Sequence, residues 1–305
     1  MVLVYVEEPG ELTQQALAFA GLLGEPLHAV CVGEPVPISG VHVVHVAEGE
    51  AFSSFAPAAI ARALVELIET LSPSAIVAAG TARGNEVLAR VAAITDLPLA
   101  ANCISAAGPL VTRVRWGGSL LEEAQLHGEP RLITVQPHAI AGTTPGGEAP
   151  PVEHFTPTLE DADLAVRVQE QVGAAAGGVS LAEAKVVVSC GRGAGSPEGF
   201  GIIEELAGLL GGAVGCSRAV TMAGWRPHTD QVGQTGTKIA PDIYIACGIS
   251  GATQHMAGCK GAKAILAVNT DPEAPILASA DYAVIGDLHE VVPAILAELR
   301  KVRGS

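Results

Sequence analysis

The chain has 305 residues, 49% of them hydrophobic and 16% charged, and this length is sufficient for two ordinary domains with separate cores. Its 17 basic and 32 acidic residues give a net charge of −15 at neutral pH. This acidic balance argues against nucleic acid and against an anionic membrane surface as partners, because both are bound through basic faces.

Short apolar runs alternate with helical patterns in the first half of the chain. Strands are expected over residues 2–8, 27–33, 41–48 and 75–80, with helices over residues 11–24, 56–71 and 84–96 between them. This alternation predicts a mainly parallel sheet covered by helices on both faces. Beyond residue 97, short β-like pieces are interrupted by Gly-Pro and Gly-Gly, which predicts hairpins added to one end of the sheet.

Residues 138–182 have a different texture. Proline and glycine recur every few positions in residues 139–157, so we expect neither helix nor strand there. We interpret residues 138–182 as an interdomain linker. The predicted domains are an N-terminal α/β domain over residues 1–182, which includes the linker, and a C-terminal domain over residues 183–305.

The second half returns to alternating strands and helices. Strands are expected over residues 185–190, 213–216, 243–248, 263–269 and 282–287, and helices over residues 197–211, 251–259 and 291–303. The predicted fold class is therefore α/β, with two domains that are each a mainly parallel sheet flanked by helices. The second is expected to be a doubly wound sheet.

Features outside these elements indicate a cytoplasmic protein. The amino-terminal residues turn acidic at once, unlike a signal peptide, and no apolar run is long enough to span a bilayer. The six cysteines lie far apart without a C-x-x-C pair. We therefore expect reduced core residues rather than disulfides or metal ligands.

Open parallel sheets bind ligands outside the carboxyl ends of their strands, and several strands of the second domain end in distinctive loops. After the first strand, Gly191 and Gly193 admit close approach to a ligand and Arg192 supplies charge, although a plain turn with a solvated arginine explains the same residues. Asp287, after the last strand, either caps the final helix or binds a ribose hydroxyl.

The loop GISGATQH is the most distinctive of these strand ends. Ser250 is a natural N-cap, and the helix that follows would make residues 250–253 a seat for a pyrophosphate through its free N–H groups and dipole. His255 would face the same space, although a lone histidine there is more often a core or surface residue. The loops contain no nucleophile–base pair, metal cluster or carboxylate dyad, so they indicate cofactor binding rather than attack on a bond.

Several segments of the second domain resemble, in order and spacing, the α subunit of electron transfer flavoproteins. They include VGQTG and GISGATQH, which match the flavin signature of that family, together with CSRAV and NTDPEAPI. The resemblance is dense over residues 185–303 and looser in the first half. It implies that the C-terminal domain is an FAD-binding domain and that the N-terminal domain contacts a β subunit.

The function implied by this resemblance is that of a redox carrier rather than an enzyme. The α subunit would form a heterodimer with a β subunit that holds AMP or a second FAD. Its own FAD would accept electrons from flavin dehydrogenases and pass them, through an anionic flavin semiquinone, to a quinone-linked oxidoreductase or another acceptor. The resemblance leaves open the dehydrogenase, the acceptor, the pathway, and whether the complex is a simple carrier or an electron-bifurcating form.

The resemblance also implies roles for individual residues. The adenosine diphosphate would lie on residues 250–255, Ser217 and Arg218 would approach the isoalloxazine, and Thr235 would hydrogen-bond N5. His255 would lie at the N1–C2=O edge, where the negative charge of the semiquinone spreads. The full set of implied FAD contacts is Arg192, Ser217, Arg218, Val232, Gly233, Gln234, Thr235, Ser250, Gly251, Ala252, Thr253, Gln254, His255, Asn269, Asp287 and Leu288.

Two other functions are compatible with a nucleotide-sized site. One is a NAD-consuming enzyme of the deacylase type with His255 as base, although the sequence offers no zinc-binding cysteine set. The other is a nucleotide-binding subunit that only scaffolds a partner. A flavin spectrum of the purified protein distinguishes the electron carrier from both.

Overall fold

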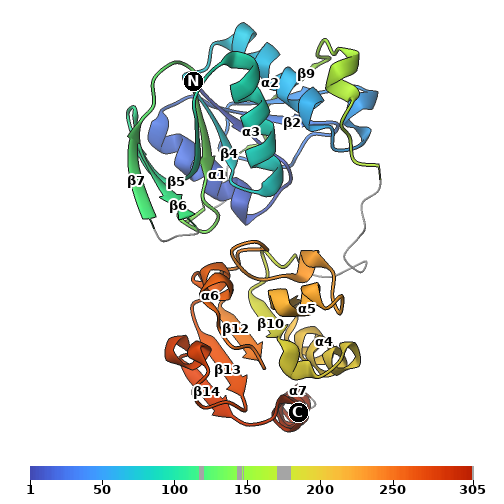
Figure 1. Cartoon of the computed structure of the whole chain (residues 1–305). Coiled ribbons are helices and arrows are strands. Elements are labelled where there is room, and N and C mark those ends of the chain that lie inside the picture. Colours follow the sequence, from blue (N-terminus) through green and yellow to red (C-terminus); the bar gives the residue numbers. More distant parts are fainter. Residues whose placement is uncertain (117–119, 143–145, 147, 170–179, 304–305) are drawn as a thin grey trace. The chain divides into compact units, whose positions relative to one another are not determined.

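The chain divides into two compact units, Met1–Val172 (unit 1) and Gly173–Ser305 (unit 2). The computed structural model describes residues 1–116, 120–142, 146, 148–169 and 180–303. Each unit contains a sheet flanked by helices (Figure 1), which confirms the predicted fold class. Residues 170–179 of the predicted linker lie outside the described residues.

Unit 1 is built on a nine-stranded sheet with the order β7-β6-β5-β8-β4-β1-β2-β3-β9. Its strands are β1 Val2–Tyr5, β2 Leu27–Val32, β3 Val43–Ala47, β4 Ala75–Ala79, β5 Leu99–Ala107, β6 Leu110–Arg115, β7 Leu120–Gln125, β8 Arg131–Val135 and β9 Val152–Phe155. Pairing is parallel from β5 to β9 and antiparallel between β5, β6 and β7. The predicted hairpin extension at one end of a parallel sheet is thus confirmed.

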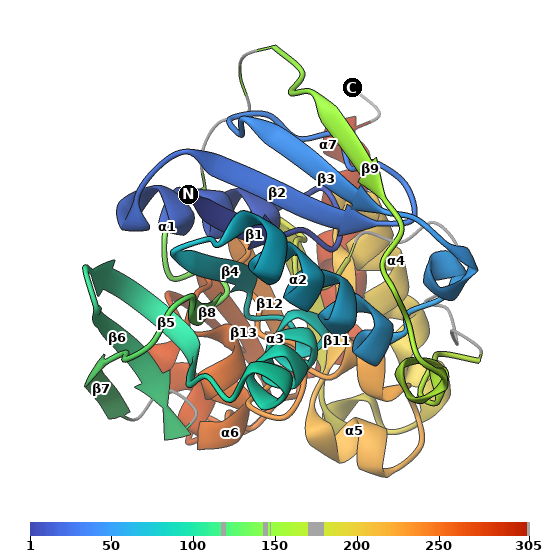
Figure 2. The same cartoon turned by 90° about the horizontal axis from the view of Figure 1, so that it is seen from above.

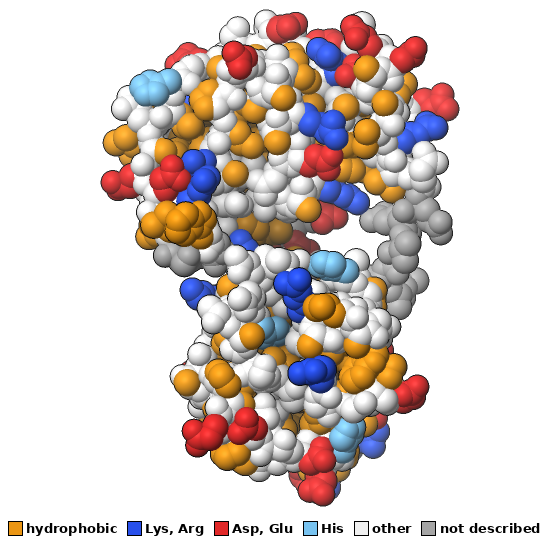
Figure 3. All heavy atoms as spheres, viewed as in Figure 1, with side chains coloured by type: hydrophobic (Ala, Val, Ile, Leu, Met, Phe, Trp, Pro, Cys, Tyr) orange, Lys and Arg blue, Asp and Glu red, His pale blue; other side chains and the backbone are white. Residues whose placement is uncertain are grey.

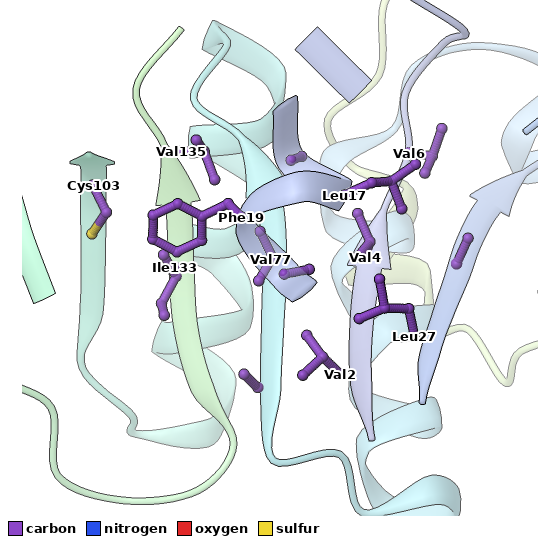
Figure 4. Packing of buried hydrophobic residues seen from close by; sticks show 14 of the residues in the cluster. Val2, Val4, Val6, Leu17, Phe19, Leu27, Val77, Cys103, Ile133 and Val135 are labelled. Carbon is purple, nitrogen blue, oxygen red and sulfur yellow. The ribbon is translucent and has the colours of Figure 1, made fainter. Parts of the chain in front are cut away.

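Alternate residues of each strand supply the two cores of unit 1. Helix α1 (Glu11–Leu23) buries Leu17 and Phe19 on one face of the sheet, and Figure 4 shows the Phe19 ring among side chains of the central strands. Helices α2 (Pro57–Leu71) and α3 (Ala82–Thr95) cover the other face, and Figure 2 shows them side by side along the sheet.

Strand β9 contradicts the expectation that residues 139–157 form no strand. Val152–Phe155 pairs in parallel with β3, with Val44 opposite Val152 and Ala47 opposite Phe155. The prediction was wrong because its argument counted prolines and glycines, whereas these four residues lie between Pro151 and Pro157 and need only one neighbour as an edge strand. A 3₁₀ helix, Asp161–Leu164, follows on the same unit, so much of the predicted linker folds with unit 1.

A histidine cluster joins the last three strands of this sheet. His28 Nδ1 lies 2.9 Å from His45 Nε2, and His45 Nδ1 lies 3.4 Å from Glu153 Oε2 on β9. The His42 ring stacks on His28 with centroids 6.5 Å apart. Burial lowers the pKa of both His28 and His45, and the neighbouring histidines lower that of His28 further, while Glu153 opposes both shifts.

Unit 2 is a five-stranded parallel sheet with the order β11-β10-β12-β13-β14. Its strands are β10 Val186–Cys190, β11 Ala213–Cys216, β12 Ile243–Cys247, β13 Ile265–Asn269 and β14 Tyr282–Ile285, and its helices are α4 Gly201–Leu210, α5 Arg218–Met222, α6 Thr253–Cys259 and α7 Leu288–Arg303. Helices α4 and α7 pack on one face of the sheet. The loop before β12 and helix α6 pack on the other, as the doubly wound prediction requires.

The chain passes from β10 to β11 on one side of it, and then crosses to β12 on the other side of β10. This reversal of strand order creates a crevice between the carboxyl ends of β10 and β12, where open α/β sheets bind their ligands. All six cysteines lie within the described residues, and all are buried and unpaired, which confirms their assignment as core residues.

The surface of each unit carries acidic and basic side chains interspersed on the face shown in Figure 3. The excess of acidic residues is therefore spread out on that face rather than gathered at one place. Among the described helices, none combines the length and the apolar character that crossing a bilayer requires.

We predict that acid weakens unit 1 through the histidine cluster. Because the folded-state pKa values of His28 and His45 lie below their unfolded value of about 6.5, the unfolded chain binds more protons below that pH. The contribution of these histidines to the free energy of unfolding is then fully present above about pH 6.5 and declines as the pH falls toward the folded pKa values. His45→Gln should make this decline less steep, by up to ~1.4 kcal/mol per pH unit.

The measurement is urea unfolding at pH 7.5 and 5.5, followed by hydrogen exchange of peptides from β2 and β3. His154→Gln is the matched control, since His154 lies on the same edge of the sheet with 47% of its side chain exposed. Equal acid sensitivity of His45→Gln and the wild type would contradict the assignment.

Candidate functional site

A pocket of about 280 Å³ opens at the carboxyl ends of β10, β11 and β12 within unit 2. It is lined by Gly191, Arg192, Ser217, Arg218, Ala219, Gln231, Val232, Gly233, Gln234, Thr235, Gly248, Ile249, Ser250, Ala252, Gln254 and His255. Most of the predicted site residues therefore meet in one place, at the edge of the sheet where the strand order reverses.

Two loops of the pocket touch backbone to backbone through glycines. The Gly191 N–H donates to the Cys247 carbonyl at 2.9 Å, and a Cβ on Gly193 would lie 2.6 Å from the Gly248 Cα. The sequence argument assigned Gly191 and Gly193 to close approach of a ligand. In the structure their small size is already required to pack the β10 loop against the β12 loop.

A second glycine contact holds the loop of residues 232–235 against helix α6. A Cβ on Gly258 would lie 2.4 Å from the backbone N and Cα of Gly233, so no larger residue fits in the present backbone. One turn earlier on the helix, the Gln254 carbonyl accepts the Gln234 N–H at 2.7 Å. These contacts place Val232 to Thr235 along one wall of the pocket.

The start of α6 differs from the sequence prediction. The helix begins at Thr253 with Ala252 as N-cap residue and no side-chain cap, so the assignment of Ser250 as N-cap was wrong. Gly251 adopts φ +82° and packs against Ile276, where a Cβ would lie 2.5 Å from the Ile276 backbone. This left-handed turn inserts two residues between Ser250 and the helix, and the Ser250 carbonyl accepts the Ile276 N–H instead.

His255 is a buried member of the pocket wall, with 7% of its surface exposed. Its Nε2 lies 2.7 Å from the Tyr244 hydroxyl. Burial lowers its pKa to about 4, although the Val232 backbone partly opposes the shift, so the ring is neutral at pH 7. Its Nδ1 is buried and has no hydrogen-bond partner of standard geometry among the described residues.

The polar side chains around the pocket are of two kinds. Arg192 and Arg218 are exposed and, among the described residues, neither forms an ion pair with a carboxylate. Thr235 is held by Gln231, whose amide donates to the Thr235 hydroxyl at 3.0 Å. Gln231 in turn accepts from the Thr221 hydroxyl at 2.7 Å. The pocket thus combines two cations with oriented neutral donors, a set that suits an anionic ligand.

Five predicted site residues do not line the pocket: Gly251, Thr253, Asn269, Asp287 and Leu288. Asn269 donates to the Ile249 carbonyl at 2.9 Å, and Leu288 is buried behind the Gly193–Gly248 contact. Both therefore support the loops from behind. The Asp287 carboxylate accepts the His289 N–H at 2.9 Å and so caps α7. Of the two roles expected for Asp287, helix cap and ribose contact, the structure shows the helix cap.

Sequence reasoning did not include Gly191, Ala219, Gln231, Gly248 and Ile249 in the predicted contact set, although all of them line the pocket. The sequence signal for Gln231 is its position as a polar residue directly before the VGQTG motif. Its burial, at 3% exposure, is seen only in the structure. Among the described residues, no group of three or more His, Cys, Asp or Glu side chains is placed to hold a metal ion.

Comparison with known proteins agrees with this geometry. An electron transfer flavoprotein domain matches residues 2–160, and an electron transfer flavoprotein FAD-binding domain matches residues 180–260. The chain is 36% identical to the electron transfer flavoprotein subunit alpha of Thermoanaerobacterium thermosaccharolyticum, across 96% of this chain and 93% of that protein. For the same subunit of Mycobacterium leprae the identity is 36% across 96% and 95% of the two chains. For Bradyrhizobium diazoefficiens it is 41% across 80% and 78%.

We predict that Gly258→Ala destabilises unit 2. The added methyl meets the Gly233 backbone at 2.4 Å, and overpacking of this kind costs about 1–3 kcal/mol. Gly208→Ala is the matched control, because Gly208 is also helical, lies in α4 and has open space around a Cβ. That change should be stabilising by about 0.5–1 kcal/mol.

Both variants are measured by urea unfolding in a Trp116→Phe background. The chain has two tryptophans, so Trp225 then reports on unit 2 alone. A Gly258→Ala protein as stable as the background protein would show that α6 does not depend on this contact.

Proposed function

Because the chain belongs to the family of electron transfer flavoprotein α subunits, we propose that it is the FAD-binding subunit of a heterodimeric electron carrier. In more detail, we propose that FAD occupies the pocket of unit 2 and receives electrons from flavin dehydrogenases. The FAD would then pass these electrons to a quinone-linked oxidoreductase or another acceptor. The family consists of redox carriers rather than enzymes, so no bond of a substrate is made or broken.

The observation that carries the proposal is a pocket at the strand ends of unit 2 with two exposed arginine side chains, Arg192 and Arg218, among its lining residues. Two cations without carboxylate partners suit a ligand that carries phosphate groups. The matched FAD-binding domain, residues 180–260, contains every residue that lines this pocket. The residues present therefore fit FAD.

The chain would bind the two ends of FAD with different groups. The loop of residues 250–254 and the guanidinium of Arg192 suit the pyrophosphate, since an arginine fork and backbone N–H groups bind phosphate oxygens. Ser217, Arg218 and Thr235 suit the isoalloxazine. The Gln231 amide occupies an acceptor site of the Thr235 hydroxyl, which leaves the hydroxyl proton available for a ring nitrogen.

His255 would act at the flavin ring as a neutral hydrogen-bonding group. When bound, FAD supplies the one-electron chemistry. The chain would supply Arg218 as the fixed positive charge and His255 as an uncharged polar group, because burial lowers the pKa of His255 to about 4. Groups that already point at the place where charge develops stabilise it without reorganisation.

The alternative of a NAD-consuming deacylase-like enzyme has less support. A general base works best when its pKa is near the working pH, and burial lowers the pKa of His255 to about 4. The Tyr244 hydroxyl also occupies Nε2. Neither feature suits proton abstraction from a substrate at pH 7.

The proposed partner of unit 1 is the β subunit, with AMP or a second FAD bound to that chain. Large apolar side chains are exposed on the β6–β7 hairpin, among them Leu110 (53%), Trp116 (78%) and Leu121 (63%), and orange side chains gather at one edge of unit 1 in Figure 3. Exposed apolar clusters of this kind mark interaction surfaces. The six buried thiols fit the further proposal of a cytoplasmic location, where thiols remain reduced.

We predict that the chain co-expressed with its β subunit is a yellow 1:1 complex with a flavin spectrum, whereas the chain alone does not exchange electrons with a dehydrogenase. Size-exclusion chromatography with light scattering measures the assembly, and absorbance measures the flavin. Leu121→Lys should weaken the complex at least tenfold, because it places a charge in an apolar contact. Leu22→Lys is the control, since Leu22 is equally exposed at 60% but lies on α1.

A colourless complex would overturn the FAD assignment. An unaided monomer that accepts electrons would overturn the assembly assignment, and equal effects of both lysine variants would remove the hairpin from the interface.

We also predict that His255→Ala lowers the first-electron reduction potential of the complex. Losing a hydrogen bond to a charged ring costs about 1.5–3 kcal/mol, which corresponds to about 65–130 mV for one electron. Stepwise reductive titration measures the potential, and His289→Ala, an exposed position on α7, is the control. An unchanged potential in His255→Ala would exclude His255 from the ring contact.

A further inference from the structure

Unit 1 has a reversal of strand order of its own. From β1 the chain continues to β2 and β3 on one side, and it then crosses to β4 on the other side of β1. Open α/β sheets bind ligands at such a reversal, outside the carboxyl ends of the strands. A pocket of about 390 Å³ opens there, lined by Tyr5 and Glu7 at the end of β1 and by Arg83 in the first turn of α3, which follows β4. Its volume is that of a small-molecule site, about 300–1,000 Å³.

Tyr5 supplies the observation that points to a ligand. Only 4% of its surface is exposed, yet it lines the pocket, and among the described residues its hydroxyl makes no hydrogen bond. The hydroxyl oxygen is not one of the sealed buried atoms, so it is reached from the pocket. Burial and the charge of Glu7 raise the pKa of Tyr5, and the hydroxyl therefore keeps its proton. A buried tyrosine hydroxyl normally has a partner, and here that partner has to come from the pocket.

Glu7 is the second polar group at the end of β1. The Thr81 hydroxyl accepts the Gly84 N–H at 2.8 Å, so its own proton is donated to Glu7 Oε1, 2.5 Å away. Burial raises the pKa of Glu7, while the Thr81 hydroxyl, Arg83 and the Gly84 backbone oppose the rise and favour the carboxylate. An ionised carboxylate has about four acceptor sites. The Glu7 side chain is thus fixed by the start of α3 and keeps acceptor sites for a ligand.

Arg83 supplies a planar cation. Its guanidinium carbon lies 5.0 Å from the centroid of the Phe55 ring, and Phe55 also lines the pocket. Guanidinium planes stack on aromatic rings and on nucleobases. Arg83 and Phe55 therefore offer a flat, partly apolar surface that suits a planar ring.

The charges of the lining balance. Among the described lining residues, Glu7 is the single carboxylate and Arg83 the single cationic side chain, so the two charges sum to zero. A phosphate would be attracted by Arg83 and repelled by Glu7, and an ammonium group would meet the reverse. The lining therefore suits an uncharged ligand that carries hydroxyl donors and a planar ring.

We infer that the pocket at the end of β1 is a ligand site of unit 1 and that it takes a ribonucleoside. The ribose hydroxyls would donate to Glu7, since carboxylates at the strand ends of α/β sheets bind ribose in this way. The Tyr5 hydroxyl would donate to a ribose oxygen, and the base would lie against Arg83 and Phe55. The inference rests on unit 1 alone and does not depend on FAD in unit 2.

The test is ¹⁹F NMR of the complex with the β subunit, with fluorotyrosine incorporated in this chain. The chain has three tyrosines, and comparison with Tyr5→Phe identifies the Tyr5 signal. Adenosine, guanosine, cytidine and uridine are added in turn at millimolar concentration. At least one of them should shift the Tyr5 signal saturably and leave unchanged the signal of Tyr282, which is 65% exposed on β14.

The midpoint of the Tyr5 shift gives the affinity at this site, whatever else the β subunit binds. Glu7→Gln should weaken binding about tenfold, because a hydrogen bond to a carboxylate becomes one to a neutral amide. Glu8→Gln is the matched control, since Glu8 is the exposed neighbour of Glu7 and does not line the pocket. The 2′-deoxynucleoside should bind more weakly than the ribonucleoside, and the 5′-monophosphate should bind no more tightly.

A Tyr5 signal that none of the four ribonucleosides moves would show that the pocket holds only water and would overturn the inference. So would a shift confined to the signal of Tyr244, because that residue lies in unit 2. Equal affinities in Glu7→Gln and Glu8→Gln, or tighter binding of the 5′-monophosphate, would overturn the assigned ligand class. A colourless complex would overturn the proposed function and leave this test intact, since the Tyr5 signal requires no flavin.

Discussion

Close backbone packing between glycine-containing loops is the constraint on which the site of unit 2 depends. The loops after β10 and β12 meet at Gly193 and Gly248, and the loop of residues 232–235 meets α6 at Gly233 and Gly258. A Cβ on Gly193 would lie 2.6 Å from the Gly248 Cα, and a Cβ on Gly258 would lie 2.4 Å from the Gly233 backbone. A larger residue therefore does not fit at Gly193 or at Gly258. Because side chains are absent there, the walls of the pocket are held by backbone hydrogen bonds and contact rather than by interdigitated side chains.

This arrangement explains why so polar a site is formed within an apolar sheet. The side chains that β10 and β12 direct to either face are mostly apolar and buried, and polar groups enter from the loops beyond the strand ends. Buried polar groups are costly unless they are paired, and Gln231, which is 3% exposed, accepts from Thr221 and donates to the exposed Thr235. The partly buried Asn269 donates to the Ile249 carbonyl. His255 Nε2 lies 2.7 Å from the Tyr244 hydroxyl.

The sequence predicts the elements well where patterning is local. Strand β12 and the end of β13 are continuous apolar runs between turn residues, and they form where expected. Strand β9 was missed because an edge strand depends on a neighbour more than a hundred residues away, β3, and this pairing leaves no mark in local composition. The N-cap was misplaced because the φ of Gly251 is set by packing on Ile276, a contact that does not follow from propensity.

The sequence predicted which residues gather around the pocket more completely than it predicted their protonation states. The family resemblance named His255 and the loop of residues 232–235 as site residues, and the structure places them around one pocket, but the charge state of the ring did not follow from it. That state depends on burial, which lowers the pKa of the ring to about 4, and on the Val232 backbone, which opposes the shift. In the sequence, Tyr244 is one more apolar position of a buried strand. Only the packing of β12 against α6 places its hydroxyl 2.7 Å from His255 Nε2.

The packing of the loops and the chemistry of the ring are thereby linked. His255 lies three residues before Gly258 on the same short helix, and α6 is held against the loop of residues 232–235 by the Gly258–Gly233 contact. Hydrogen bonds of this kind have donor–acceptor distances of about 2.7–3.2 Å, and His255 Nε2 lies 2.7 Å from the Tyr244 hydroxyl. A shift of α6 by about an ångström would therefore break this hydrogen bond. The glycines thus do more than leave room for a cofactor, because by holding α6 against the loop of residues 232–235 they also hold the His255 ring beside Tyr244.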